Sequence, residues 1–293
     1  MAGSERVPGW TGELGATLAT APWWAWWPAG FALGTCLGSF LNVCIVRLPR
    51  EQSIVRPRSR CPACGHPIAW SDNIPLVSFM RLRGRCRHCG KPIGWRYPVV
   101  ELFTGLMTVA VLHRFGAAPV GLIYLALVAA LIAASFIDLE FQIIPDEISL
   151  GGLAAGLVLS GLVPMLHGTD LRWLALGRSA LGMLVGGGLL YATGLMGDVL
   201  FRKESMGGGD IKLLAMAGAV CGWKIAAVAF IISPMLALLP GLFVLLIKRS
   251  HVIPYGPFLS LGVVVSLFFG SDLLRLSGVE ETIRLLWEYY GWP

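Results

Sequence analysis

The chain has 293 residues, of which 56% are hydrophobic and only 14% are charged, and its mean hydropathy is +0.71. Ordinary soluble domains carry about 25% charged residues, so this composition excludes a soluble globular protein and predicts one that crosses a membrane several times. Because the net charge of +6 is concentrated in one loop, it indicates orientation in the membrane rather than nucleic-acid binding.

Eight apolar stretches predict an all-α polytopic membrane protein with about eight transmembrane helices. They lie near residues 24–46, 98–115, 118–137, 148–166, 174–196, 211–222, 225–247 and 257–273. The sixth stretch has roughly half of the ~20 residues that a crossing needs, so we expect a shallow or broken span there. Glycine recurs in these stretches, and small residues let membrane helices approach closely.

The loop between the first two stretches, residues 47–97, is strongly basic. It holds eleven of the 23 Lys and Arg residues and only two acidic residues, Glu51 and Asp72. Because Lys and Arg are enriched in the cytoplasmic loops of membrane proteins, we place this loop in the cytoplasm. A basic loop beside a bilayer most simply meets anionic headgroups, so membrane lipids are expected partners and nucleic acid is not.

This orientation predicts four parts. They are an N-terminal segment with the first helix (1–46), the cytoplasmic loop (47–97), the main membrane domain (98–273) and a C-terminal tail (274–293). The tail is rich in Trp and Tyr, which concentrate at membrane–water interfaces. We therefore expect the tail to lie at the outer interface of the membrane.

Four of the seven cysteines form two C-x-x-C pairs within the loop. The pairs are CPAC and CRHC, with Cys61, Cys64, Cys86 and Cys89. Two such pairs about twenty residues apart are typical of a Zn²⁺ site, in which each pair directs two thiolates to one tetrahedral ion. Two disulfides are the alternative, and a cytoplasmic location argues against them. We expect the zinc to be structural, because four cysteine ligands leave no open position for a substrate.

Carboxylates gather at the ends of the third, fourth and sixth stretches. Asp138 and Glu140 end the third, Asp146 and Glu147 open the fourth, and Asp210 opens the sixth. In the predicted topology all of them reach the cytoplasmic face and can converge. Ionisable groups at membrane depth are costly and are functional candidates by default. Helix capping is the competing explanation, because Asp is a favoured N-cap residue.

Three glycines precede Asp210 in the stretch MGGGDIK, residues 206–212. One glycine suffices for a turn, whereas three leave a bare strip of backbone with which an extended peptide can pair. A carboxylate beside such a strip, with a second carboxylate nearby, meets the needs of aspartyl proteolysis. One ionised Asp takes a proton from water, and the other, protonated, hydrogen-bonds the scissile carbonyl, because two close carboxylates share one proton.

Several segments resemble the type IV prepilin peptidases, a family of GxGD-type membrane aspartyl proteases. The segments include GSFLNVCIVRLPR (38–50), the cysteine loop (60–105), FIDLEFQIIPDEISL (136–150), KESMGGGDIKLLAMAGAVCGW (203–223) and IPYGPFLSLG (253–262). The resemblance implies that Asp146 and Asp210 are the catalytic pair and that Gly207 and Gly209 are the glycines of GxGD. It also implies cleavage of basic prepilin and pseudopilin leaders after a glycine, at the cytoplasmic face of the bacterial inner membrane. The tail would then be periplasmic.

Most members of this family also methylate the new N-terminus with S-adenosylmethionine as the methyl donor. The cysteine tetrad is absent from some members that only cleave, so its presence implies the bifunctional form and a methyltransferase-associated loop. The resemblance also implies roles for Gly84, Asn42 and Arg47. A hydrogen bond between helices is the alternative role of Asn42, and snorkelling is that of Arg47. Glu101 is a candidate base for the amine, and pairing with a loop Arg is its alternative role.

Three competing functions stay open. A peptidase whose zinc loop is only structural would cleave without methyl transfer. A proton-coupled transporter would carry charges near mid-span and matching interrupted helices in two repeats, whereas this sequence places its Asp residues at span ends. A non-enzymatic assembly scaffold would use the zinc loop for docking and would not need its aspartates.

Overall fold

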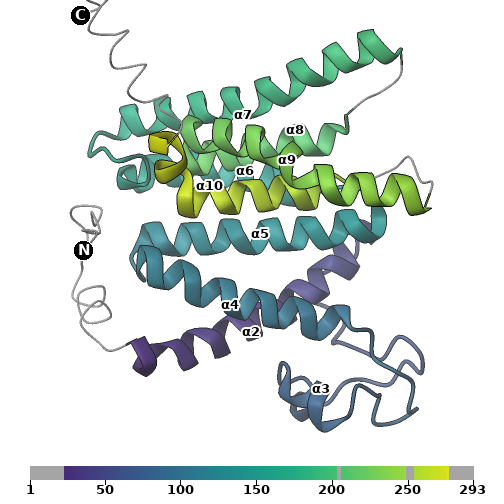
Figure 1. Cartoon of the computed structure of the whole chain (residues 1–293). Coiled ribbons are helices and arrows are strands. Elements are labelled where there is room, and N and C mark those ends of the chain that lie inside the picture. Colours follow the sequence, from purple (N-terminus) through teal and green to yellow (C-terminus); the bar gives the residue numbers. More distant parts are fainter. Residues whose placement is uncertain (1–22, 203–205, 249–253, 277–293) are drawn as a thin grey trace, which may run out of the picture. The chain divides into compact units, whose positions relative to one another are not determined.

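The computed structural model describes residues 23–202, 206–248 and 254–276 (Figure 1). Over these residues the chain is almost entirely helical, and its only β-structure is two isolated bridges, Arg60 with Pro67 and Arg85 with Pro92. The predicted all-α class is confirmed. The first 22 residues and most of the expected interfacial tail lie outside the described residues.

All eight apolar stretches fold as helices. Their bounds are α2 Trp23–Arg47, α4 Arg96–Phe115, α5 Pro119–Phe141, α6 Asp146–Leu162, α7 Arg172–Phe201, α8 Gly208–Cys221, α9 Trp223–Lys248 and α10 Gly256–Leu276. Six helices of the described chain are long and apolar enough to cross a membrane, so this is a multi-pass membrane protein. The other two, α6 and α8, have 17 and 14 residues. The predicted short sixth stretch is therefore confirmed as a short helix.

The chain divides into two compact units. Unit 1 comprises Met1–Cys44 and Ser53–Ala129, and unit 2 comprises Ile45–Gln52 and Ala130–Pro293. In unit 1, α2 and α4 meet through small residues. A Cβ added to Gly38 would lie 2.7 Å from the Glu101 Cα, and one added to Gly105 would lie 2.8 Å from the Phe31 ring. This close approach is the arrangement that glycine favours between membrane helices.

In unit 2 the short helix α8 is surrounded by longer ones. It lies among α6, α7, α9 and α10 and contacts all four (Figure 1). Every residue from Leu213 to Val220 is buried. The backbones of α7 and α8 touch, because a Cβ on Gly182 would overlap the carbonyl oxygen of Gly218, and the reverse also holds. The C-terminal part of α8 is thereby packed tightly against α7.

Candidate active site and metal centre

Asp210 lies in the first turn of α8, directly after the glycine segment. Gly207 is the N-cap residue in an extended conformation, and its carbonyl oxygen accepts the Asp210 N–H at 3.2 Å. Gly207 and Gly208 are exposed. The Asp210 Oδ1 atom is buried and has no hydrogen-bond partner. Only Gly207 is extended, because Gly208 and Gly209 already belong to α8, so the expected strip of three bare glycines is reduced to one extended residue before the helix.

Asp138 is a buried carboxylate near the C-terminal end of α5, with 7% of its surface exposed. Its Oδ2 atom accepts the backbone N–H of Gly256, the first residue of α10, at 2.9 Å. The carboxyl groups of Asp138 and Asp210 lie near enough to interact electrostatically. Asp138 and Asp210, which are 72 positions apart in the sequence, thus both belong to unit 2.

Asp146 lies in a different environment. It is exposed, and its Oδ1 atom accepts a hydrogen bond from Lys212 Nζ at 2.7 Å. Lys212 follows Asp210 by two residues, which places it about 200° around the helix from Asp210. The carboxyl group that acts on Asp210 is that of Asp138. Asp146 is therefore paired with Lys212, and Asp138 is the charged neighbour of Asp210, so the expected pairing of Asp146 with Asp210 stays a prediction.

Neither Asp146 nor Asp210 caps its helix. The N-cap residues of α6 and α8 are Pro145 and Gly207, so neither Asp146 nor Asp210 occupies an N-cap position. Asp146 is the first residue of α6 and Asp210 the third of α8. Acidic residues in a first turn still complement the helix dipole. That effect accounts for the exposed Asp146, but it does not require the buried, unpaired oxygen of Asp210.

The four loop cysteines converge, as predicted. Their Sγ atoms all lie within 4.8 Å of one another. Each C-x-x-C pair closes a similar turn, in which Gly65 donates to the Cys61 carbonyl at 2.8 Å and Gly90 donates to the Cys86 carbonyl at 2.9 Å. Both glycines have positive φ, which favours glycine there. Backbone amides of Cys64 and Ala63 lower the pKa of the Cys61 thiol to about 7, which favours the thiolate that binds metals.

Asp72 organises the basic side chains of the loop. Its carboxylate accepts hydrogen bonds from Arg87 Nε at 2.7 Å and from Arg81 at 2.9 Å. These contacts, with Arg87 contributing most, lower the pKa of Asp72. One of the two acids of the loop is therefore already paired within it.

Three of the four residues implied for methyl transfer have structural contacts in unit 1. Glu101 is buried, its Oε2 atom accepts the Leu76 N–H at 2.9 Å, and its carboxyl group also hydrogen-bonds Ser39. Asn42 Nδ2 donates to the Tyr97 carbonyl at 3.1 Å, which matches the expected bond between helices. Gly84 has φ +65° and lies against the Phe79 ring.

Arg47, the fourth of these residues, is the last residue of α2 and belongs to unit 2. Its carbonyl oxygen accepts the Gln52 N–H at 3.0 Å. The structure therefore gathers Glu101, Asn42 and Gly84 in one unit, and the role of Arg47 in methyl transfer stays a prediction.

Sequence comparisons match both units to known families. Residues 32–115 match the model described as "Bacterial Peptidase A24 N-terminal domain", and residues 125–242 match "Type IV leader peptidase family". No solved structure matches the chain.

Curated relatives named "Prepilin leader peptidase/N-methyltransferase" match most of the chain. The protein from Myxococcus xanthus is 42% identical, over 82% of this chain and 66% of its own length, which is slightly under two thirds. That from Aeromonas hydrophila is 35% identical over 86% of this chain and 93% of its own. That from Pseudomonas aeruginosa is 33% identical over 83% and 90%. The chain therefore belongs to the type IV leader peptidase family.

Proposed function

We propose that this membrane enzyme cleaves the leader peptides of prepilins and pseudopilins and then methylates the new N-terminal residue. Both activities are named together in its relatives. The observation that carries the peptidase activity is the pair of carboxyl groups of Asp138 and Asp210, beside the open backbone of the glycine segment. A scaffold would not need these aspartates, and a transporter would carry its charges near mid-span, so both are the weaker alternatives.

Asp138 and Asp210 are the proposed proteolytic pair. One of them, ionised, takes a proton from a water molecule, and the other, protonated, hydrogen-bonds the scissile carbonyl. An extended substrate would lie along Gly207, which is extended and exposed, beside the exposed Gly208 at the start of α8. The substrate must unwind locally before cleavage, because a peptide bond inside a helix is shielded from attack.

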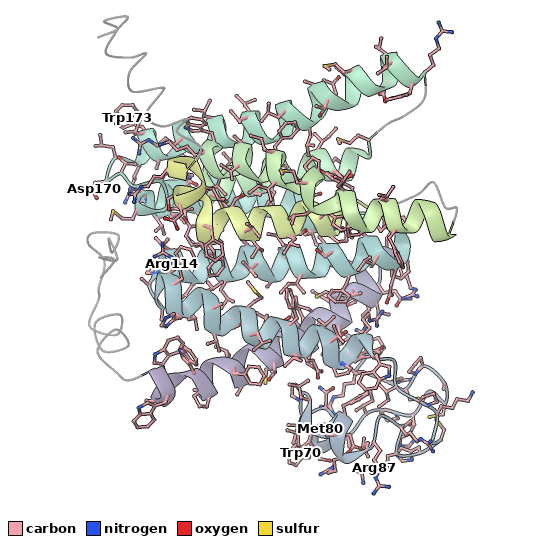
Figure 2. All side chains as sticks on the ribbon, in the orientation of Figure 1. Trp70, Met80, Arg87, Arg114, Asp170 and Trp173 are labelled. Carbon is pink, nitrogen blue, oxygen red and sulfur yellow. The ribbon has the colours of Figure 1, made fainter. Side chains whose placement is uncertain are left out.

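The proposed orientation places the loop and the active site on the cytoplasmic face of the bacterial inner membrane. It rests on the eleven basic residues of 47–97. Trp70 and Met80 project from this loop as exposed side chains (Figure 2). Aromatic and basic residues together suit the headgroup layer of a membrane, so lipid contacts at the loop are part of this proposal.

The cysteine cluster fits a zinc ion. Four thiolates at about 2.3 Å from a tetrahedral ion lie about 3.8 Å from one another. The Sγ atoms of Cys61 and Cys89 are 3.9 Å apart. Cys61, Cys64, Cys86 and Cys89 would hold the ion, and binding it would supply folding energy to a loop that has little core of its own.

The loop also offers a place that fits S-adenosylmethionine. A cavity of about 400 Å³ lies beside Gly84. Its lining includes the rings of Phe79 and Trp95, which could stack on an adenine, and Arg83 and Arg85, which could pair with a carboxylate. When bound, this cofactor would supply the methyl group that is transferred to the amine.

One assay tests both activities. Purified enzyme in detergent is incubated with a prepilin and S-adenosylmethionine labelled in the methyl group. We expect a shortened product with label on its new N-terminus, and no cleavage by the Asp210→Asn variant, which should retain its metal. Full cleavage by that variant would refute the aspartyl mechanism. Cleavage without label would leave a peptidase with a structural loop.

A further inference from the structure

We propose that the start of α10 positions the proteolytic pair and decides which member carries the proton. In this assignment the backbone N–H of Gly256 keeps Asp138 ionised, and Asp210 holds the shared proton. Gly256 is thus a positioning residue, and Asp138 and Asp210 have different roles. The inference rests on the proposed peptidase function and deepens it.

Gly256 makes a direct contact with Asp138. Gly256 is the first residue of α10, so its N–H has no acceptor within the helix. It donates instead to Asp138 Oδ2 at 2.9 Å, in buried surroundings. A hydrogen bond from a helix start to a carboxylate favours the ionised form, because the N-terminal end of a helix carries partial positive charge.

The contact between Gly256 and Asp138 requires glycine. A Cβ added to Gly256 would lie 2.8 Å from Asp138 Oδ2 and 3.2 Å from its Cγ. The carboxylate would have to move away from the N–H to make room. The contact, and not a left-handed backbone, sets the requirement, since Gly256 is not among the residues with positive φ. A substitution by alanine therefore tests the contact without backbone strain.

Asp210 lacks the hydrogen-bond donor that Asp138 has. Its Oδ1 atom is buried and has no donor, and its charged neighbour is Asp138. Tyr255, next to Gly256, lies within electrostatic range of Asp210, and its hydroxyl hydrogen-bonds Ser233. Asp210 lies in the first turn of α8, and Asp138 faces the first residue of α10, so the N-terminus of a helix acts on each carboxyl group. The two carboxyl groups differ in that only Asp138 accepts a direct hydrogen bond from a helix N-terminus. A carboxyl group whose buried oxygen has no donor is more stable in its neutral form, which favours the proton on Asp210.

These roles complete a balanced hydrolysis. The water oxygen attacks the scissile carbonyl carbon while Asp138 takes a water proton and Asp210 gives its proton to the carbonyl oxygen. The C–N bond then breaks as Asp138 passes its proton to the leaving amine. Asp210 recovers a proton from the hydroxyl of the intermediate. The products are a carboxyl and an amine, and both aspartates return to their starting states.

The first test compares Gly256→Ala with Gly270→Ala, a change in the same helix where the nearest atom to the added Cβ would be 4.0 Å away. We expect Gly256→Ala to lower kcat for prepilin cleavage about 100-fold, as small displacements of catalytic groups do, while KM stays near the wild-type value. Gly270→Ala should keep both constants. Equal kcat values for the two variants, or a loss confined to KM, would overturn the inference.

The second test reads protonation directly and does not depend on folding of Gly256→Ala. Infrared spectra at neutral pH are compared for wild type, Asp138→Asn and Asp210→Asn, in the C=O stretching band of protonated carboxyl groups. We expect a component that disappears in Asp210→Asn and persists in Asp138→Asn. Any other pattern overturns the assignment. If Asp210→Asn still cleaves, the proposed function fails; if it is inactive and Gly256→Ala behaves as wild type, only this inference fails.

Discussion

Glu101 connects α4 to the loop through a single backbone hydrogen bond, from Leu76. Replacement by Ala would leave that N–H without its acceptor, at a cost of about 1–3 kcal/mol, whereas Gln keeps an acceptor. If the role of Glu101 is to position the loop, Glu101→Gln should methylate nearly as well as wild type and Glu101→Ala should not. The measurement is transfer of label from S-adenosylmethionine. Loss of transfer in Glu101→Gln, with metal retained, would instead identify Glu101 as the base.

The helical spacing of apolar residues before Asp138 distinguishes it from the other aspartates, whereas its neighbouring residues do not. Asp146 and Asp210 both follow Pro or Gly at expected helix starts, so local patterns treat them alike. Asp138 continues the buried face of α5 instead. That face consists of Leu127, Leu131, Ala134 and Asp138, at helical spacing. A carboxylate on a buried stripe is the stronger candidate, but only packed neighbours show that α8 and α10 meet it there.

Among the helices, α7 and α8 make the closest contact of backbones. A side chain at Gly182 would overlap the Gly218 carbonyl, whereas a Cβ at Gly188, in the same helix, meets nothing within 4 Å. Overfilling a tight contact typically costs about 1–3 kcal/mol. We therefore expect Gly182→Leu to lower the midpoint of thermal unfolding and to impair cleavage, while Gly188→Leu changes neither. Equal midpoints would show that this contact does not hold α8 in place.

The 3-10 turn Pro164–His167 ends α6 earlier than its apolar stretch predicts. His167 anchors this turn, because its Nε2 atom hydrogen-bonds Ser160 Oγ at 2.8 Å. Burial lowers the pKa of His167 below its usual value near 6.5. The unfolded chain therefore binds a proton more readily, and stability should fall as pH drops below about 6.5.

The test of this pH effect is the unfolding midpoint of wild type and His167→Gln between pH 7.5 and pH 5. We expect the wild-type midpoint to fall more steeply with acid than that of the variant. Parallel curves would mean that His167 contributes nothing to the pH dependence.

For the molecule as a whole, the candidate metal site and the proposed proteolytic pair belong to different units. The cysteine cluster belongs to unit 1, and Asp138 and Asp210 belong to unit 2. We expect stoichiometric zinc in the purified wild type and its loss in Cys64→Ser, measured by elemental analysis. Cys36→Ser, which changes an exposed cysteine of α2 outside the cluster, is the matched control and should retain the metal. Equal zinc in both variants would contradict a four-cysteine site.

At this scale the sequence predicted the helical class, the short sixth stretch and the convergence of the cysteines. Each follows from a local property, namely the length of an apolar run or the spacing of a motif. The pairing of carboxyl groups does not, because it depends on how α5, α8 and α10 meet. The resemblance to a family implied Asp146 instead, and that pairing stays a prediction beside the proposed pair of Asp138 and Asp210.

Cleavage rates of Asp138→Asn, Asp146→Asn and Asp210→Asn, measured side by side on one prepilin, address the identity of the proteolytic pair most directly. Zinc content and unfolding midpoints serve as folding controls. We predict a loss of about 10⁴-fold or more for Asp138→Asn and Asp210→Asn. Asp146→Asn should cleave nearly as wild type, because it removes only an exposed ion pair, worth about 0–1 kcal/mol. Wild-type cleavage by Asp138→Asn, together with an inactive Asp146→Asn, would contradict the pairing of Asp138 with Asp210.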